Sequence, residues 1–146
     1  MHPYPHLYKA GTTGGPTGML TVSSPGLVDL PSAPPPEFDG PGGVWSPETM
    51  LCAAVADCFV LTFRAAARAS KLEWLLLECS VEGTLERVEG VTQFTRYVTT
   101  ATLHVPPGTD AGRAQKLMEK AEHGCLVANS LTGKRELVAR VVESQE

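Results

Sequence analysis

Four cysteines, Cys52, Cys58, Cys79 and Cys125, are the residues of this 146-residue chain that could carry covalent chemistry. A deprotonated thiol is a nucleophile and can be oxidised reversibly. The four cysteines have neither Cys-x-x-Cys spacing nor the density of a disulfide scaffold. They therefore indicate a cytoplasmic protein whose thiols are reduced or redox-active.

Cys58 and Cys125 differ in what the sequence places around them. Cys125 begins a short helix predicted over residues 126–131, and a helix N-terminus lowers the pKa of a thiol. Cys58 has no such group nearby, and Asp57 would disfavour its thiolate if both side chains pointed the same way. Adjacent helix residues point about 100° apart, so that effect need not arise. Taken alone, buried cysteines are more often structural than reactive.

The other candidate residues carry weaker signals. Cys79 falls in an apolar row of a predicted strand and is interpreted as a core residue. His123 could bias the protonation of Cys125, but a solvent-facing histidine at a helix end is the favoured interpretation. His104 stands at a strand end without an obvious partner. No set of four Cys or His residues has the spacing of a zinc site.

A long helix over residues 46–70 must position Cys58. Ser46 can cap it, Pro47 suits its first position, and Glu48 in the first turn suits the helix dipole. Between residues 50 and 63 only Asp57 and Thr62 are clearly polar, which predicts a central helix covered by protein on most sides. The apolar run is too short to span a bilayer.

The remaining segments predict an α+β fold with an antiparallel sheet, in a single domain over residues 1–146. The predicted strands are residues 7–13, 19–23, 26–30, 72–86, 92–105 and 136–142, and the second helix begins at Thr109 or Asp110 and is interrupted at Gly124. A phosphate loop at residues 14–18 is disfavoured because no Gly-Lys-Ser/Thr and no helix follow. Residues 31–45 are interpreted as a stiff Pro/Gly connector rather than a proline-recognition motif.

The composition excludes some classes of partner. The net charge of −4 argues against nucleic acid. No signal-peptide pattern or lipidation motif is seen, so we expect no membrane partner.

Two segments resemble the OsmC/Ohr family of osmotically inducible and organic hydroperoxide resistance proteins. Ser46-Pro47-Glu48 followed by Cys58-Phe59 resembles the family's Pro-Glu…Cys-Phe helix. The segment from His123 to Asn129, His-Gly-Cys-Leu-Val-Ala-Asn, resembles the segment that carries the second cysteine. The order of elements also matches, so that the resemblance covers nearly the whole chain.

The resemblance implies an intertwined α+β homodimer with a long buried central helix, acting as a thiol peroxidase in oxidative stress defence. By position, Cys58 is expected to attack an organic hydroperoxide and Cys125 to resolve the sulfenic acid as a disulfide. Glu48 is expected to help organise the site. An external dithiol is the implied reductant, with no metal or bound organic cofactor.

The chain departs from the family at the arginine expected near the thiolate. Pro16 stands at one family position and Glu37 or Phe38 at the other. Arg64, Arg68 or Arg96 are the candidates to replace it. The alternative function is an OsmC-like protein that binds a small apolar ligand at the dimer interface without peroxidase chemistry.

Overall fold

The computed structural model describes residues 1–145, which form two compact units. The units are Met1–Met50 and Leu51–Glu146. In chain order the elements are β1 (Gly11–Thr13), β2 (Leu20–Ser23), β3 (Leu30–Ser32), η1 (Pro36–Phe38), α1 (Pro47–Ser70), β4 (Leu76–Val88), β5 (Val91–Val105), α2 (Ala111–Gly124), α3 (Leu126–Asn129) and β6 (Lys134–Glu143). The boundary between the units falls within the continuous helix α1, and a single domain over residues 1–146 stays a prediction.

The first unit contains a three-stranded antiparallel sheet in the order β1-β2-β3. The third strand is β3, not the predicted 26–30, because residues 24–27 form a turn in which Leu27 N–H donates to Ser24 O over 3.1 Å. Gly26 has φ +77° there, a conformation that suits glycine. The first predicted strand is also shorter than expected, since residues 7–10 lie outside β1.

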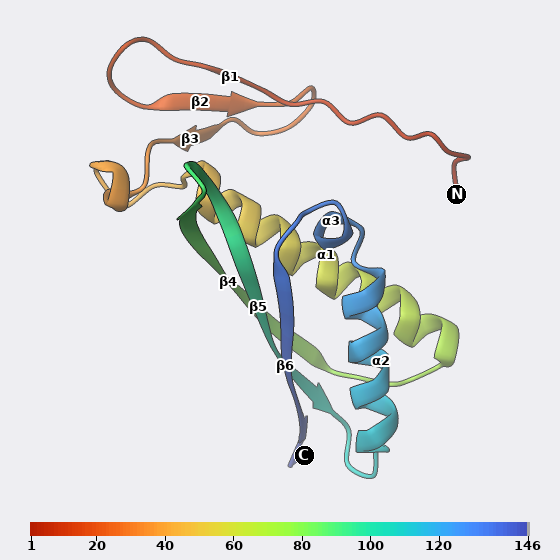
Figure 1. Cartoon of the computed structure of the whole chain (residues 1–146). Coiled ribbons are helices and arrows are strands. Elements are labelled where there is room, and N and C mark those ends of the chain that lie inside the picture. Colours follow the sequence, from red (N-terminus) through yellow and green to blue (C-terminus); the bar gives the residue numbers. More distant parts are fainter. Residues whose placement is uncertain (146) are drawn as a thin grey trace. The chain divides into compact units, whose positions relative to one another are not determined.

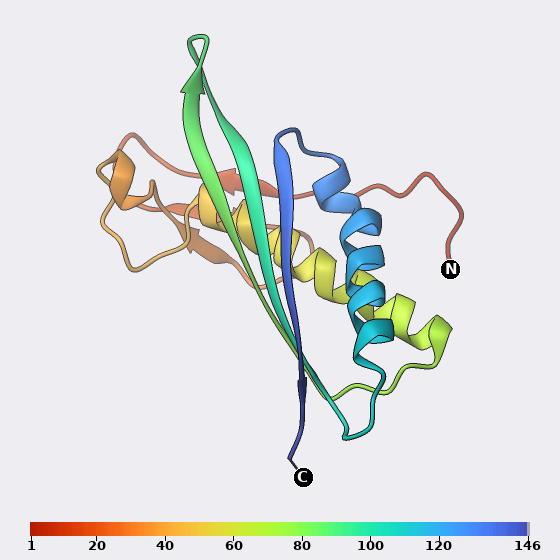
Figure 2. The same cartoon turned by 60° about the horizontal axis from the view of Figure 1, so that its bottom comes forward.

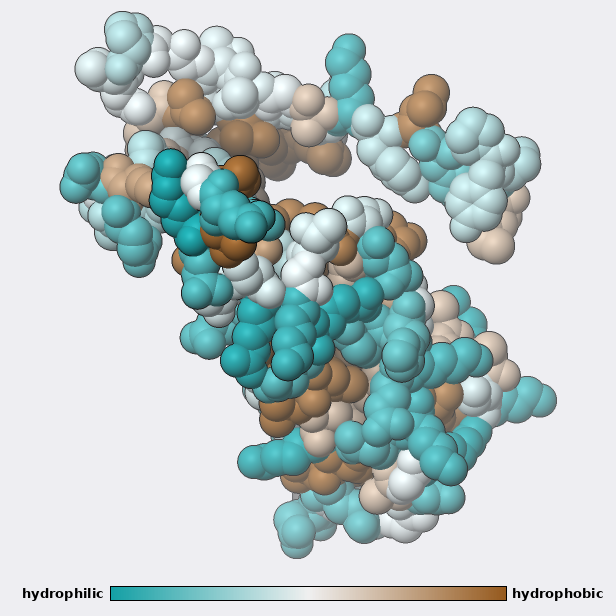
Figure 3. Space-filling model, in the orientation of Figure 1, coloured by the Kyte–Doolittle hydropathy of each residue, from teal (hydrophilic) through white to brown (hydrophobic). Residues whose placement is uncertain are grey.

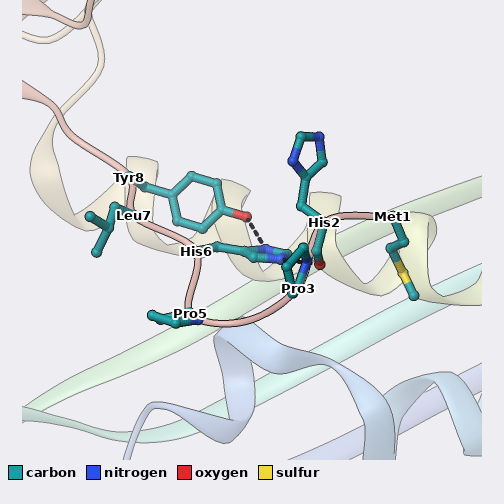
Figure 4. A pocket seen from close by; sticks show the side chains of 7 residues that line it. All are labelled: Met1, His2, Pro3, Pro5, His6, Leu7 and Tyr8. Atoms are coloured by element: carbon teal, nitrogen blue, oxygen red, sulfur yellow. Dashed lines mark hydrogen bonds between the residues drawn. The ribbon is translucent and has the colours of Figure 1, made fainter.

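The first eight residues fold on themselves without regular structure (Figure 4). Nδ1 of His6 lies 3.2 Å from the Tyr8 hydroxyl, and the rings of Tyr4 and His6 stack 4.7 Å apart. The hollow drawn in Figure 4 is lined by seven of these eight residues and by no cysteine.

Helix α1 begins as predicted. Thr49 N–H donates to Ser46 Oγ over 3.2 Å, Ser46 N–H donates to Thr49 Oγ1 over 3.0 Å, and Pro47 occupies the first helical position. The helix ends at Ser70, where Lys71 adopts φ 56° and Leu72 N–H donates to Ala67 O over 3.0 Å.

One face of α1 is buried and the opposite face is exposed. The buried residues are Val55, Phe59, Phe63 and Ala67. By length and composition alone α1 could cross a membrane, a test that core helices also pass. Ala54, Leu61 and Ala65 lie on the exposed face. The prediction that protein covers α1 on most sides therefore requires a partner chain on this face, and it stays a prediction.

The second unit is built on the sheet β4-β5-β6. Strands β4 and β5 pair antiparallel through a turn at Glu89 and Gly90, both at positive φ, and their hairpin extends beyond β6 (Figure 2). The predicted antiparallel pairing is wrong for β6, which runs parallel to β5. The reason is the crossover through α2 and α3, which returns the chain to the same end of the sheet.

Both helices α1 and α2 pack on one face of this sheet (Figure 1). The buried core joins Phe59, Phe63 and Ala67 of α1, Ala101, Leu103 and Val105 of β5, and Ala114, Leu117, Met118 and Ala121 of α2. A bulge between Thr84 and Leu85 ends the regular alternation of β4, so that Leu85 is exposed. Polar residues cover most of the visible surface of this unit, with hydrophobic patches between them (Figure 3).

Candidate active site

Cys58 and Cys125 meet in one small cluster of the second unit. Cys125 is fully buried with Val55 and Ala128, and Cys58, Val81, Val127 and Leu131 pack against these three residues. Figure 1 shows α3, which follows Cys125, beside α1, which carries Cys58. The fold therefore brings together two cysteines that are far apart in the sequence.

The pKa of the half-buried Cys58 thiol is lowered. Burial raises it, but neutral groups outweigh burial: the backbone N–H of Val127, the Cys125 side chain, the Thr62 hydroxyl and the backbone N–H of Leu126. Two of these donors are the first amides of α3, which have no partner inside the helix. No charged side chain is among the groups that shift this pKa.

Burial raises the pKa of Cys125 to about 11. The Ala128 backbone opposes burial and lowers this pKa, whereas Cys58 and the Glu122 carboxylate raise it by smaller amounts. The thiol donates to Val55 O, with Sγ 3.8 Å from that oxygen. The start of α3 does lower the pKa of Cys125, through the Ala128 backbone, but burial outweighs that effect, so the net shift is opposite to the expected one. The first two amides of α3 act on Cys58 instead.

Thr62 and Gly124 also belong to the site, and sequence reasoning missed both contributions. Thr62 Oγ1 lies 3.9 Å from Cys58 Sγ and donates to Cys58 O over 2.7 Å. A Cβ added at Gly124 would lie 3.4 Å from Cγ2 of Thr62, so the end of α2 packs closely against α1. The spacing of Thr62, one helical turn after Cys58, is the only sequence signal that could have indicated its role.

Glu48 lies in the first turn of α1, ten residues before Cys58. A rise of 1.5 Å per residue separates the two by ~15 Å along the helix axis, so one chain does not bring them together. Oε1 of Glu48 is buried and has no hydrogen-bond partner among the described residues.

Cys52 and Cys79 both have raised pKa values. Burial raises the pKa of Cys79 to about 11, with Cys125, Asp57 and Glu122 adding to the effect. Burial also raises the pKa of Cys52, against a smaller opposite effect of the Gly83 backbone. Cys79 packs against the main core, as the core interpretation predicted.

None of the charged candidates is among the groups that shift the pKa of Cys58. Arg96 pairs with Glu136 over 2.8 Å on the exposed part of the sheet, while Arg64, Arg68 and Asp57 are exposed on α1. His104 gains the partner that the sequence did not suggest, Glu78 at 2.7 Å. His123 is exposed in the last turn of α2, as predicted. Among residues 1–145 no group of three or more His, Cys, Asp or Glu could hold a metal ion.

Comparison with known proteins agrees with this architecture. The protein YmaD of Bacillus subtilis, itself uncharacterized, is 32% identical over 136 residues and covers 90% of each chain. An organic hydroperoxide resistance protein OsmC from Legionella pneumophila superposes with a TM-score of 0.72 at 25% identity, covering 95% of this chain and 98% of that one. An OsmC-like protein of unknown function from Vibrio cholerae superposes with a TM-score of 0.81 at 18% identity, over 94% and 100% of the two chains.

The model of the OsmC-like protein family matches residues 40–138, a span that contains α1 with Cys58 and the α2–α3 turn with Cys125. The protein therefore belongs to the OsmC-like family.

Proposed function

We propose that this protein is a thiol peroxidase that reduces organic hydroperoxides through Cys58 and Cys125. One observation carries the proposal: the two thiols share one cluster, and their pKa values are displaced in opposite directions. The lowered pKa suits Cys58 to nucleophilic attack. The raised pKa keeps Cys125 protonated until a disulfide can form. The names of relatives such as the Legionella organic hydroperoxide resistance protein support the same chemistry.

The reaction uses two electrons from the two thiols. The Cys58 thiolate attacks one peroxide oxygen, the O–O bond breaks, and the alkoxide leaves and takes up a proton as an alcohol. Cys58 is then a sulfenic acid. The Cys125 thiol loses its proton and attacks the Cys58 sulfur, so that an S–S bond forms and water is released. An external dithiol restores both thiols by exchange, which agrees with a cytoplasmic location.

Apolar side chains beside Cys58 favour an organic substrate over hydrogen peroxide. Leu61, one turn after Cys58 on α1, is 56% exposed, and Leu126, whose N–H acts on the Cys58 sulfur, is 68% exposed. Exposed leucines at this point can cover the alkyl part of a hydroperoxide and gain about 25 cal/mol for each Å² that they bury.

We further propose that the active form is a homodimer with two composite sites. Two antiparallel copies of α1 would bring Glu48 of one chain near Cys58 of the other and would cover the exposed Ala54 and Ala65. Glu48 Oε1, buried without a partner among the described residues, is consistent with such an arrangement. Sedimentation equilibrium should show a dimer, and a stable monomer at micromolar concentration would contradict this part of the proposal.

The peroxidase proposal is tested by one equivalent of cumene hydroperoxide, followed by peptide mapping of the thiols. We expect a Cys58–Cys125 disulfide, with Cys52 and Cys79 still reduced. Cys58 left unmodified, or bridged to Cys52, would contradict the assignment. Unmodified thiols together with saturable binding of the apolar alcohol product would favour the alternative function, binding of a small apolar ligand.

A further inference from the structure

Arg135, the second residue of β6, makes three contacts around the turn that carries Cys125. Its Nε donates to Glu122 Oε1 over 2.7 Å, its Nη1 donates to Asn129 Oδ1 over 2.7 Å, and its Nη2 donates to the backbone oxygen of Glu122. The planar guanidinium suits this arrangement because its donors are fixed relative to one another. The side chains of Arg135 and Glu122 are only 28% and 15% exposed, so solvent screens this ion pair less than a surface pair.

These contacts join both helices on either side of the Cys125 turn. Glu122 and His123 stand at the end of α2, where the last carbonyls have no partner within the helix. Arg135 satisfies Glu122 O, and Nδ2 of Asn129 donates to His123 O over 3.1 Å. Residues 124–127, which include Cys125 and the two amides that act on Cys58, thus lie between two anchored points.

The start of β6 is itself held firmly against β5. Gly133 has φ +113°, and a Cβ added there would lie 3.2 Å from both the carbonyl carbon and oxygen of Thr95. Arg135 follows two residues later and pairs with Tyr97 in the parallel register. The sheet therefore determines where the Arg135 backbone lies, and the side chain transmits that position to the turn.

We propose that Arg135 is a positioning residue for the thiol pair: it holds residues 124–127 so that the Leu126 and Val127 amides face Cys58 and the Cys125 thiol stays beside it. Its effect on Cys58 does not depend on the peroxidase proposal, whereas its effect on disulfide formation does. Arg135 also pairs with the Glu122 carboxylate, which is one of the titratable groups that act on Cys125. Other titratable groups near Cys125 are Cys58 of α1 and Cys79 of β4.

The test measures alkylation of Cys58 by iodoacetamide against pH, read by peptide mapping, in the full chain and in Arg135→Gln. Loss of the Arg135 contacts with Glu122 and Asn129, here called the clamp, should move the Cys58 titration midpoint to higher pH. A shift of one pH unit would lower the alkylation rate about tenfold at pH values below the midpoint. Arg96→Gln is the matched control, because it removes an arginine–glutamate pair from the same sheet without touching the turn. It should leave the midpoint unchanged.

Two milder variants cover the case in which Arg135→Gln does not fold. Arg135→Lys keeps the charge but cannot make all three contacts, and Asn129→Ala removes one anchor without changing the charge. Both should shift the midpoint upward, by less than Arg135→Gln. A wild-type midpoint in the folded variants would overturn the proposal. Failure of the wild-type protein to react with hydroperoxide would reject the peroxidase function, and the alkylation result would still decide the role of Arg135.

Discussion

Cys52 and Cys58 lie on the same helix, yet their pKa values are displaced in opposite directions. Burial raises the pKa of Cys52, and the Gly83 backbone offsets this only in part. Burial acts on Cys58 in the same direction, but four neutral groups outweigh it and lower the pKa. The difference shows that the direction of each pKa shift depends more on the segment packed against α1 than on α1 itself.

The largest effect that we expect separates these two cysteines by activity. Cys58→Ser should lower the rate of organic hydroperoxide reduction at least about a thousandfold, because it removes the nucleophile. Cys52→Ser should retain most of the wild-type rate. The measurement is hydroperoxide consumption with a dithiol reductant. Equal losses in the two variants would remove the distinction between the thiols.

Cys125→Ser should separate the formation of the Cys58 sulfenic acid from the formation of the disulfide. Cys58 should still form a sulfenic acid with one equivalent of hydroperoxide, but no disulfide can follow, so the sulfenic acid should react with dimedone. Excess hydroperoxide should then carry Cys58 on to the sulfinic acid. Mass spectrometry distinguishes these products. A disulfide between Cys58 and Cys79 in this variant would show that a second thiol can resolve the intermediate.

The pH dependence of alkylation should also differ between the two thiols of α1. The pKa of Cys58 lies below the usual 9.0 and that of Cys52 above it, so Cys58 has the larger thiolate fraction at any pH below 9.0. Cys58 should therefore be alkylated first as the pH rises. Without a cation among the groups that shift its pKa, we expect its midpoint above neutral pH and slow turnover at pH 7. A midpoint well below pH 7 would show that a cation, such as one from a partner chain, acts on Cys58.

Glycine substitutions at the two regions should give different results. A Cβ at Gly83 would lie 3.1 Å from Cys52 Sγ and 3.0 Å from the Phe94 ring, so Gly83→Ala should destabilise the protein by about 1–3 kcal/mol. It should leave the alkylation midpoint of Cys58 unchanged. Gly124→Ala places a Cβ 3.4 Å from Thr62 and should cost less than about 1 kcal/mol. Denaturant unfolding measures both, and the opposite order would contradict this account of the packing.

The smallest expected effect is that of Thr62→Val. The Thr62 hydroxyl is 3.9 Å from the Cys58 sulfur, a weak contact, and is one of four groups that lower the Cys58 pKa. Its removal should lower the alkylation rate of Cys58 at neutral pH by about threefold or less. Alkylation of Cys52 in the same sample is the internal control. A loss as large as that expected for Arg135→Gln would mean that Thr62, rather than the α3 turn, dominates.

The sequence by itself determined the elements whose signals are local. The Ser46 cap, Pro47 and the apolar run placed α1 within one residue of its observed bounds. The predicted strands over residues 72–86 and 92–105 correspond to β4 and β5, which pair as neighbours in the sheet. The family motifs also singled out Cys58 and Cys125, which lie in one cluster. These features could be predicted because caps, turns and periodicity are properties of neighbouring residues.

Only the tertiary structure decided the direction of β6 and the direction in which the pKa of each thiol is displaced. The parallel pairing of β6 depends on where the α2–α3 crossover returns the chain to the sheet. The start of α3 was recognised in the sequence, but its first amides lower the pKa of Cys58 across the fold rather than that of adjacent Cys125. The clamp formed by Arg135, Glu122 and Asn129 likewise joins three separate elements. A pKa depends on burial and on donors within a few ångströms, and for Cys58 the donors come mainly from segments that are distant in the sequence.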